Sequence, residues 1–527
     1  MRYLFLLCIF CFTHAYAQPT AKAWDQRLGG TGVEYPVKIK ELPQGGFIML
    51  GWSSSSQSFD KTEANRDSTG ATGDYWLVKL DAQGQKIWDH TYGGSLDESP
   101  TDILVLADGG FLLAGYSVSE ANGDKSQPRV GGPDFWIVRT DSMGNKIWDK
   151  TIGGTGVDQL NAAVQSNDGG FFLSGSTLSG IGGDKTSPAI GSFDFWLVKT
   201  DSLGNLLWDK TFGGLQSDNA YAITKTQNGG LLMGGYSESS IGFDKSEAPR
   251  GQYDFWVIRL NSNGIKLWDK TIGGINPDYL FTQCATTDGG FLLGGDSFSP
   301  AGFDKTAANN GADDYWIVKL NSNGSLAWDK SFGGTDFDEL NLILPLDSGG
   351  FLLTGESYSA IGFEKSEANL GIEQIWMINV DTAGSIRWDK TWFTNGHDEL
   401  CAGIPTQDGC YLGFNYTVAD TGGYKTASNY GNGDIWMAKL CYSFTGINEV
   451  HPESIIVFPN PASDVLNIAH LQKDASINCY DALGNLISSS IATGKTFSID
   501  LSRRSPGLFL LEIISGKTRS VIKVIHE

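Results

Sequence analysis

The chain has 527 residues, of which 40% are hydrophobic and 19% charged, and its formal net charge at pH 7 is -22. The length and apolar content allow an extensive core, and the acidic balance argues against nucleic acid as a partner. Residues 451–527 contain seven acidic and seven basic side chains, so the excess negative charge lies in the preceding part of the chain.

The N-terminus, MRYLFLLCIFCFTHAYA, has one basic residue, an apolar run from Tyr3 to Phe12 and a small-x-small motif at Ala15-Tyr16-Ala17. This pattern predicts a signal peptide at residues 1–17, cleaved before Gln18. No later stretch is long and apolar enough to cross a bilayer, so we expect no transmembrane segment.

Five cysteines remain after cleavage, an odd number that does not indicate a disulfide framework. They are Cys284, Cys401, Cys410, Cys441 and Cys479. Cysteine is often a buried apolar residue, and we expect that role here. The alternative is one bridge among Cys401, Cys410 and Cys441.

Tryptophan repeats with a period of sixty residues through most of the chain. One series is Trp76, Trp136, Trp196, Trp256, Trp316, Trp376 and Trp436, and the second is Trp88, Trp148, Trp208, Trp268, Trp328 and Trp388. Trp24 precedes the second series by sixty-four residues, because the first unit carries an insertion near Asn65 to Thr72. Fourteen of the sixteen tryptophans therefore occupy repeat positions. A period of this size indicates one supersecondary unit that buries its apolar faces against copies of itself.

Each unit contains four strand-like runs. In the third unit, the turn NDGG and the turn DSLGN each join two of these runs into a hairpin. The third run, FDFWLVKT, is apolar on both alternations, as expected when both faces of a sheet are covered. The sequence therefore predicts an all-β, seven-bladed β-propeller of four-stranded blades at residues 18–440. A β-helix would repeat more often, and separate sandwiches would need linkers.

The two ends of the repeat array complement each other. The chain enters with a lone fourth strand, AWDQRLGG at Ala23 to Gly30, and leaves after a third strand at Ile435 to Leu440. We expect the N-terminal strand to complete the last blade, which would remove the exposed sheet edges.

The DSLGNLLW hairpins resemble the repeats of quinoprotein-type and assembly-factor propellers, and DGGFLLAG and DFW resemble a group of secreted bacterial repeats. The C-terminal runs IIVFPNPASDVLNI, INCYDALGNLI, FSIDLS, SPGLFLLEI and VIKVI resemble the type A C-terminal sorting domain of the type nine (type IX) secretion system. The resemblance to the sorting domain implies a small β-sandwich at residues 455–527, a linker at 441–454, and the type IX secretion machinery as partner. It also implies a secreted protein, released or held at the cell surface.

Chain connections in a four-stranded meander alternate between its ends, so the long loops between second and third strands share one face with the links between blades. Long loops are often functional, and we expect the binding face there. Their shared lysines are Lys61, Lys125, Lys185, Lys245, Lys305, Lys365 and Lys425. The residues before the lysines are Asp60, Asp124, Asp184, Asp244, Asp304, Glu364 and Tyr424.

Two further series of acids repeat with the blades. Asp74, Asp134, Asp194, Asp254, Asp314 and Asp434 open third strands, with Gln374 as the exception. The WDx runs contribute Asp25, Asp89, Asp149, Asp209, Asp269, Asp329 and Asp389. Oxygen ligands of this kind could bind Ca²⁺, although no loop has the acid spacing of an EF-hand. We expect instead that these acids cap turns and pair with the lysines, because a feature repeated sevenfold usually builds the scaffold.

Few residues suit catalysis. Only His90 and His397 fall within the repeats, neither with a partner at ligand spacing, and we expect His397 to be a satisfied polar loop residue. No HExxH, GxSxG, Walker or paired CxxC motif occurs. The sequence therefore assigns no catalytic residue and no cofactor, and leaves a metal site open.

Two functions fit this pattern. The favoured one is a non-catalytic binding module for a glycan, a surface polymer or a protein, with Phe243, Phe303 and Phe363 among the loop contacts. The alternative is an extracellular propeller enzyme, a quinoprotein-like oxidoreductase or a polysaccharide hydrolase or lyase. Non-repeated polar residues at the central pore would favour the enzyme.

Overall fold

A computed structural model describes residues 18–67, 69–442, 456–469, 471, 474–481, 485–502, 504–515 and 518–526. The predicted signal peptide and residues 443–454 of the predicted linker lie outside this described part. The chain divides into two compact units at residue 442. All regular elements of the described residues are strands.

The first unit is a seven-bladed β-propeller, as predicted, and each blade is a four-stranded antiparallel sheet. Blades 1 to 3 are β2 (Glu34–Glu41), β3 (Phe47–Ser53), β4 (Asp74–Leu80), β5 (Lys86–Tyr92); β6 (Glu98–Val105), β7 (Phe111–Ser117), β8 (Asp134–Thr140), β9 (Lys146–Ile152); and β10 (Asp158–Gln165), β11 (Phe171–Thr177), β12 (Asp194–Thr200), β13 (Leu206–Phe212). Blades 4 to 6 are β14 (Asp218–Lys225), β15 (Leu231–Ser237), β16 (Asp254–Leu260), β17 (Lys266–Ile272); β18 (Asp278–Ala285), β19 (Phe291–Ser297), β20 (Asp314–Leu320), β21 (Leu326–Phe332); and β22 (Asp338–Pro345), β23 (Phe351–Ser357), β24 (Gln374–Val380), β25 (Ile386–Trp392). Blade 7 is β26 (Asp398–Pro405), β27 (Tyr411–Thr417), β28 (Asp434–Tyr442) and β1 (Pro19–Leu28).

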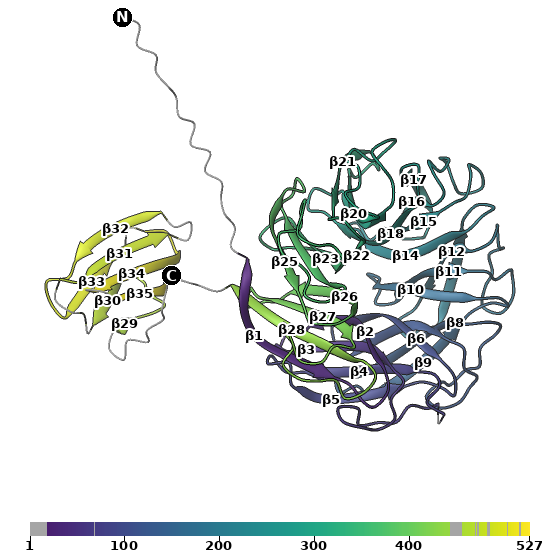
Figure 1. Cartoon of the computed structure of the whole chain (residues 1–527), viewed down its shortest axis with the longest axis horizontal. Helices are drawn as coiled ribbons and strands as arrows, with labels where there is room; N and C mark the ends of the chain where they lie inside the picture. The colour runs from purple at the N-terminus through teal and green to yellow at the C-terminus, as the bar shows by residue number, and fades with distance from the viewer. Residues whose placement is uncertain are drawn as a thin grey trace, which may run out of the picture. The chain divides into compact units, whose positions relative to one another are not determined.

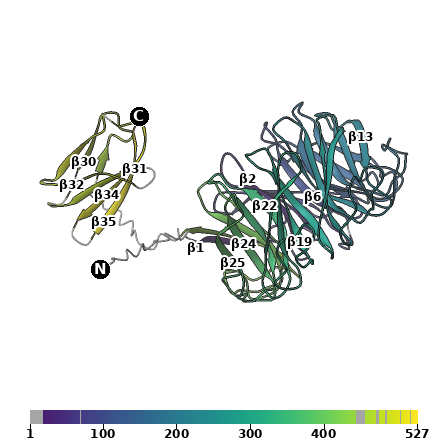
Figure 2. The ribbon, with the colours of Figure 1, turned by 90° about the horizontal axis from the view of Figure 1, so that it is seen from above.

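The blades surround a common axis. The first strand of each blade lies toward the centre of the ring and contacts the first strands of neighbouring blades (Figure 1). A view turned by 90° shows the strands of this unit from the side (Figure 2). The short turns hold glycine in the left-handed region, for example Gly169 at φ 84° and Gly204 at φ 76°, which explains the fixed glycines of NDGG and DSLGN. The long loops and inter-blade links consequently share the opposite face.

The core lies between blades. The first series of tryptophans is fully buried, and every residue of β12 is buried, as its two-sided apolar pattern predicts. Phe135 of blade 2 packs against Trp196 of blade 3 with ring centroids 4.7 Å apart, and Phe195 packs against Trp256 in the same way. Because each blade buries its aromatic face only against the next, the closed ring is needed to complete the core.

Blade 7 is closed by the N-terminal strand, which confirms the predicted complementarity of the ends. β1 pairs antiparallel with β28, and Trp24 faces Lys439 just as Trp208 faces Lys199 in blade 3. Leu28 is buried in the core between blades 7 and 1. The N-terminal strand thus takes the register of an ordinary fourth strand. β28 itself continues through Tyr442, beyond residue 440.

A disulfide joins Cys410 to Cys441 within blade 7, whereas Cys284, Cys401 and Cys479 are buried thiols. The expectation of buried thiols is therefore wrong for two of the five. The repeat explains the pairing, because the corresponding residues of blade 6 are Gly350 and Asp381. A Cβ on Gly350 would lie 2.9 Å from the Asp381 Cα, so these two positions are adjacent in every blade.

The second unit is a small two-sheet structure of strands, in agreement with the predicted β-sandwich. One sheet contains β29 (Ile456–Phe458), β30 (Val465–Ala469) and β33 (Thr496–Asp500). The other contains β32 (Leu486–Ile491), β31 (Ser476–Asp481), β34 (Gly507–Ser515) and β35 (Thr518–His526). Leu466 and Ile468 from the first sheet and Ile477 and Leu511 from the second share one buried core.

Candidate functional site

The links between blades are held by buried carboxylates at the start of each first strand, a series that the sequence analysis overlooked. Glu34 accepts the Gly30 N–H at 2.9 Å, and Asp158 accepts the Gly154 N–H at 2.7 Å. Residues at these seven positions are fully buried: Glu34, Glu98, Asp158, Asp218, Asp278, Asp338 and Asp398. These acids cap backbone N–H groups, which is a structural role.

The three series of acids singled out by the sequence also accept hydrogen bonds from the scaffold. Asp209 of the WDK run accepts the indole N–H of Trp196 at 3.0 Å, and the same indole bond recurs in all seven blades at 3.0–3.3 Å. Asp194 accepts the Ile190 N–H at 2.8 Å. Asp184 accepts the Gly153 N–H at 3.2 Å. The repeated acids therefore cap turns and links, as expected.

In the described part of the chain, the loop lysines do not form the expected ion pairs with these acids. All seven are at most 3% exposed. Lys61 donates to the Thr91 hydroxyl at 2.6 Å and lies 5.8 Å from the Trp76 ring centroid. Burial lowers the pKa of Lys61 to about 8, although nearby carboxylates oppose this shift. The ion pairs of the WDx acids instead use the lysine three residues earlier, as in Lys86–Asp89 at 2.6 Å.

Four phenylalanines on the long loops occupy a backbone conformation that favours glycine. Phe59, Phe243, Phe303 and Phe363 have φ between 48° and 53°, whereas Gly123, Gly183 and Gly423 occupy the same loop position in blades 2, 3 and 7 at φ 57–59°. A non-glycine residue in this region costs about 1–2 kcal/mol. The fold therefore accepts glycine here, and phenylalanine is retained at a backbone cost.

These side chains are also exposed. Phe243, Phe303 and Phe363 are 69%, 68% and 67% exposed. Phe243 borders a shallow pocket of about 240 Å³, together with Ile241 from its own loop and Leu215 from the preceding link. Phe59 differs, because its ring stacks on Tyr430 of blade 7 with centroids 4.1 Å apart. The loop face therefore presents separate apolar groups at successive blades.

The mouth of the central channel is not sevenfold. Three positions near the long-loop ends of the blades hold acids only in blades 5 to 7, and the equivalent residues elsewhere are glycine, serine, proline, asparagine, glutamine or aromatic residues. These acids are Asp296, Asp313, Glu339, Glu356, Glu373 and Glu399. They lie on or immediately before the first and third strands, or at the end of the second strand. The departure from the repeat is confined to one sector of the ring.

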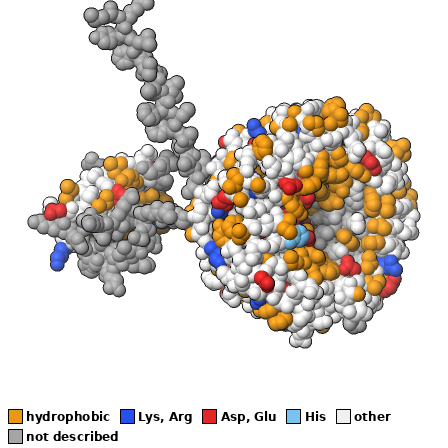
Figure 3. Space-filling model, viewed as in Figure 1, with side chains coloured by type: hydrophobic (Ala, Val, Ile, Leu, Met, Phe, Trp, Pro, Cys, Tyr) orange, Lys and Arg blue, Asp and Glu red, His pale blue; other side chains and the backbone are white. Residues whose placement is uncertain are grey.

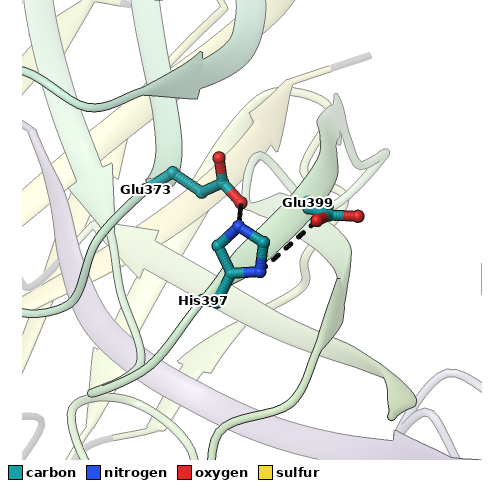
Figure 4. Close-up of side chains that lie close together, drawn as sticks. All are labelled: Glu373, His397 and Glu399. Atoms are coloured by element: carbon teal, nitrogen blue, oxygen red, sulfur yellow. Dashed lines mark ion pairs between the residues drawn. The ribbon is translucent and has the colours of Figure 1, made fainter. Parts of the chain in front are cut away.

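Glu373, His397 and Glu399 form the densest part of this sector (Figure 4). Nε2 of His397 pairs with Oε1 of Glu373, and Nδ1 lies 3.3 Å from Oε1 of Glu399. Glu373 is 1% exposed, whereas the side chains of His397 and Glu399 are 34% and 41% exposed. The cluster thus has a buried end and an open end, and His397 has two partners that the sequence analysis did not assign.

Burial and mutual repulsion act on these carboxyl groups. Burial, followed by the charges of Glu399 and Glu339, raises the pKa of Glu373 to about 8. Burial, followed by Glu339 and Glu373, raises the pKa of Glu356 to about 8. Oε2 of Glu373 and Oε2 of Glu356 are buried without a hydrogen-bond partner among the described residues. This sector therefore concentrates buried carboxyl groups whose charged forms are disfavoured and whose oxygens lack partners among the described residues.

Aromatic side chains occupy the corresponding positions of blades 4 and 5. Tyr236 stacks with Tyr221 at 5.3 Å and meets the edge of Tyr279 at 4.9 Å, and Tyr253 lies 5.6 Å from Tyr279. The space-filling view shows the disc hollowed at its centre, with hydrophobic side chains gathered along part of the hollow (Figure 3). The channel mouth therefore combines an aromatic side with an acidic side.

His90 has a different setting. Its Nδ1 lies 2.9 Å from Oε1 of Glu63, and its Nε2 lies 3.0 Å from the Met143 carbonyl oxygen. The Glu63 carboxylate is the main cause that raises the pKa of His90. Both ring nitrogens are thus satisfied within the scaffold.

The C-terminal unit is related to a known family. Residues 456–527 match the family model described as a secretion system C-terminal sorting domain. The protein is therefore a β-propeller exported by the type IX secretion system to the cell surface or the extracellular space. Among the described residues, no helix has the length and hydrophobicity needed to span a membrane.

Comparisons of the whole chain give weaker likenesses. Over 214 residues the chain is 29% identical to the regulatory protein FlaEY of Caulobacter vibrioides, a match that covers 38% of this chain and 21% of that protein's length. A protein of unknown function from Dyadobacter fermentans is 12% identical, with a TM-score of 0.35, over 80% of this chain and 99% of that one. The Pan2 WD40 domain of Neurospora crassa is 7% identical, with a TM-score of 0.41, over 80% and 96%. PorZ of Porphyromonas gingivalis, a surface component of the type IX secretion system, is 10% identical, with a TM-score of 0.18, over 95% and 100%.

Proposed function

We propose that this secreted propeller is a non-catalytic binding module whose long-loop face binds a repetitive polymer such as a polysaccharide. The observation that carries the proposal is the set of exposed phenylalanines in the left-handed backbone region. Strained residues that the fold does not require are typical of binding sites. Exposed aromatic rings on successive blades offer flat apolar surfaces to a partner whose units also repeat.

Multivalency follows from the arrangement of these rings. Phe243, Phe303 and Phe363 belong to blades 4, 5 and 6, so three equivalent loops lie side by side around the ring. Each exposed ring can bury only a modest area, and a single loop would bind weakly. Linked weak contacts can raise avidity by about 10²–10⁴ without any single strong site.

The test compares loop variants in binding of the mature secreted protein to a glycan panel. Phe243→Gly alone should weaken binding only severalfold, and Phe243→Gly, Phe303→Gly and Phe363→Gly together should abolish it. A matched control replaces three exposed apolar residues of fourth strands, Ile87→Ser, Ile147→Ser and Leu207→Ser, which are 55–57% exposed. Complete loss from one loop variant, or an equal loss in the control, would contradict multivalent binding through this face.

A second function is favoured by the acids confined to blades 5–7. We propose as the alternative an extracellular enzyme with one site at the channel mouth, because enzymes on repeat scaffolds need one differentiated group of residues. The aromatic side of the mouth could bind a sugar ring beside the acids. Assays for polysaccharide cleavage and for quinone-dependent sugar oxidation test this alternative. Activity that is lost in Glu356→Gln and retained in the triple phenylalanine variant would favour the enzyme over the binding module.

A further inference from the structure

We infer that Glu373, His397 and Glu399 form a binding site for one divalent transition-metal ion of the Zn²⁺ type per chain. One oxygen of each glutamate and one ring nitrogen lie within 4.8 Å of one another. The three residues come from the end of a long loop, a link between blades and the start of β26 (Figure 4). This inference is independent of the phenylalanine loops.

The donor types point to a transition metal. Imidazole nitrogen together with carboxylate oxygen suits Zn²⁺, whereas Ca²⁺ and Mg²⁺ prefer oxygen ligands alone. Glu339 and Glu356 face each other where β22 pairs with β23, which adds two carboxyl groups on the blade 6 side. A divalent cation would offset the repulsion among these groups.

A buried oxygen of Glu373 without a partner in the described part of the chain also points to a bound ion. Glu373 is 1% exposed, one of its oxygens faces His397, and Oε2 has no hydrogen-bond partner among the described residues. Oε2 of Glu356, a residue that is 8% exposed, is in the same condition. Leaving a buried carboxylate oxygen unpartnered is costly, and a bound ion would satisfy it.

The two glutamates have different roles. Glu373 faces Nε2 of His397 and Glu399 faces Nδ1, so only one of the two glutamates lies beside the ring nitrogen that binds the metal. Glu373 and Nε2 are the ligating pair at the buried end. Glu399 accepts the Nδ1–H and fixes the tautomer, an arrangement that commonly accompanies metal-bound histidine. The partial exposure of His397 leaves the remaining coordination positions open to water or to a group of a bound partner.

The chain offers a matched control in His90. Like His397, it pairs with a glutamate, but its Nε2 is occupied by the Met143 carbonyl and no third acidic or cysteine ligand atom was found within reach among the described residues. His90→Asn should therefore change metal binding negligibly. His397→Asn removes the same kind of side chain from the proposed site.

The experiment uses the mature full-length protein, purified without a histidine tag and stripped with EDTA. Isothermal titration with ZnCl₂ should show one ion per chain, and CaCl₂ should show none at these residues. Glu373→Gln and His397→Asn should abolish the stoichiometric binding. Glu399→Gln should weaken it about 10–100-fold, the usual effect of losing a residue that orients a ligand. Far-ultraviolet circular dichroism and melting curves establish that each variant is folded.

Four results would overturn the inference. They are the absence of Zn²⁺ binding by the wild-type protein, unchanged binding in Glu373→Gln or His397→Asn, equal loss in His90→Asn, and stoichiometric binding of Ca²⁺ instead. Glu373→Gln keeps the experiment decisive, because replacing a buried carboxyl by an amide of the same shape removes charge without opening a cavity. If protons rather than a metal satisfy these carboxyls, the titration will show no ion.

Discussion

Replacing the exposed loop phenylalanines by glycine should separate binding from stability. Phe243→Gly relieves the left-handed strain, about 1–2 kcal/mol, and restores glycine's flexibility to the unfolded chain, which costs about 0.5–1 kcal/mol. About a third of the ring is covered, since Phe243 is 69% exposed. At roughly 200 Å² for a ring and 25 cal/mol per Å², the lost burial is worth at most about 1.6 kcal/mol. The net change should lie within about 1.5 kcal/mol of zero.

Melting and chemical denaturation of the triple variant Phe243→Gly, Phe303→Gly and Phe363→Gly provide the measurement. Its stability should stay close to that of the wild type while polymer binding is lost. Gly183→Ala is the control for strain. Its Cβ would lie 2.6 Å from the Gly153 carbonyl oxygen, so it should destabilise the fold by more than about 1 kcal/mol. If the free energy of unfolding of the triple variant falls by far more than the sum of the three single changes, the phenylalanines are structural and the binding argument fails.

Three other predictions concern closure, oxidation and export. Deleting residues 18–31 removes β1 and with it Leu28, whose burial alone contributes about 1.5–3 kcal/mol. The melting temperature should therefore fall by many degrees. An unchanged cooperative melt would show that the strand is dispensable. Cys410→Ser opens a loop with a sequence separation of 31, so it should cost about 3–4 kcal/mol and make the melt insensitive to reductant. Cys284→Ser keeps the bridge and should respond to dithiothreitol as the wild type does; equal melts of the wild type with and without dithiothreitol would refute a role for the bridge. Removing residues 456–527 should trap a folded propeller in the periplasm. Normal extracellular levels of the truncated protein would contradict the sorting role.

The repeat made the propeller predictable. A sixty-residue period fixes which positions are equivalent, so the burial of Trp196 in one blade implies that of Trp256 in the next. The mismatch between the two ends also predicts the register of β1, because Trp24 must face the residue that other WDx tryptophans face. These inferences depend only on sameness between blades.

The candidate site was less predictable because it depends on differences between blades. Glu373 corresponds to Gly73 and Tyr253 in other blades. The sequence does not show that His397, at the start of blade 7, lies beside Glu373 of blade 6. The Cys410–Cys441 bridge also depends on spatial adjacency, although Gly350 and Asp381 mark the same neighbouring positions in blade 6. An alignment of the seven units shows where blades 5–7 depart from the others, and spatial proximity then decides which of these residues meet.

The loop phenylalanines and the channel acids share one property, which is that the scaffold does not require them. Glycine replaces phenylalanine at Gly123, and glycine replaces Glu373 at Gly73, with the blade intact in both cases. The two features differ in symmetry. Phenylalanine recurs in four blades and suits a partner with repeated units, whereas the acids and His397 occupy one sector and suit a single ion or ligand. Because these arrangements lie on the same end of the blades, one polymer could be bound by the loops while one of its units reaches the channel mouth. In that case zinc should alter the affinity for a short oligomer and leave the avidity contributed by distant loops unchanged.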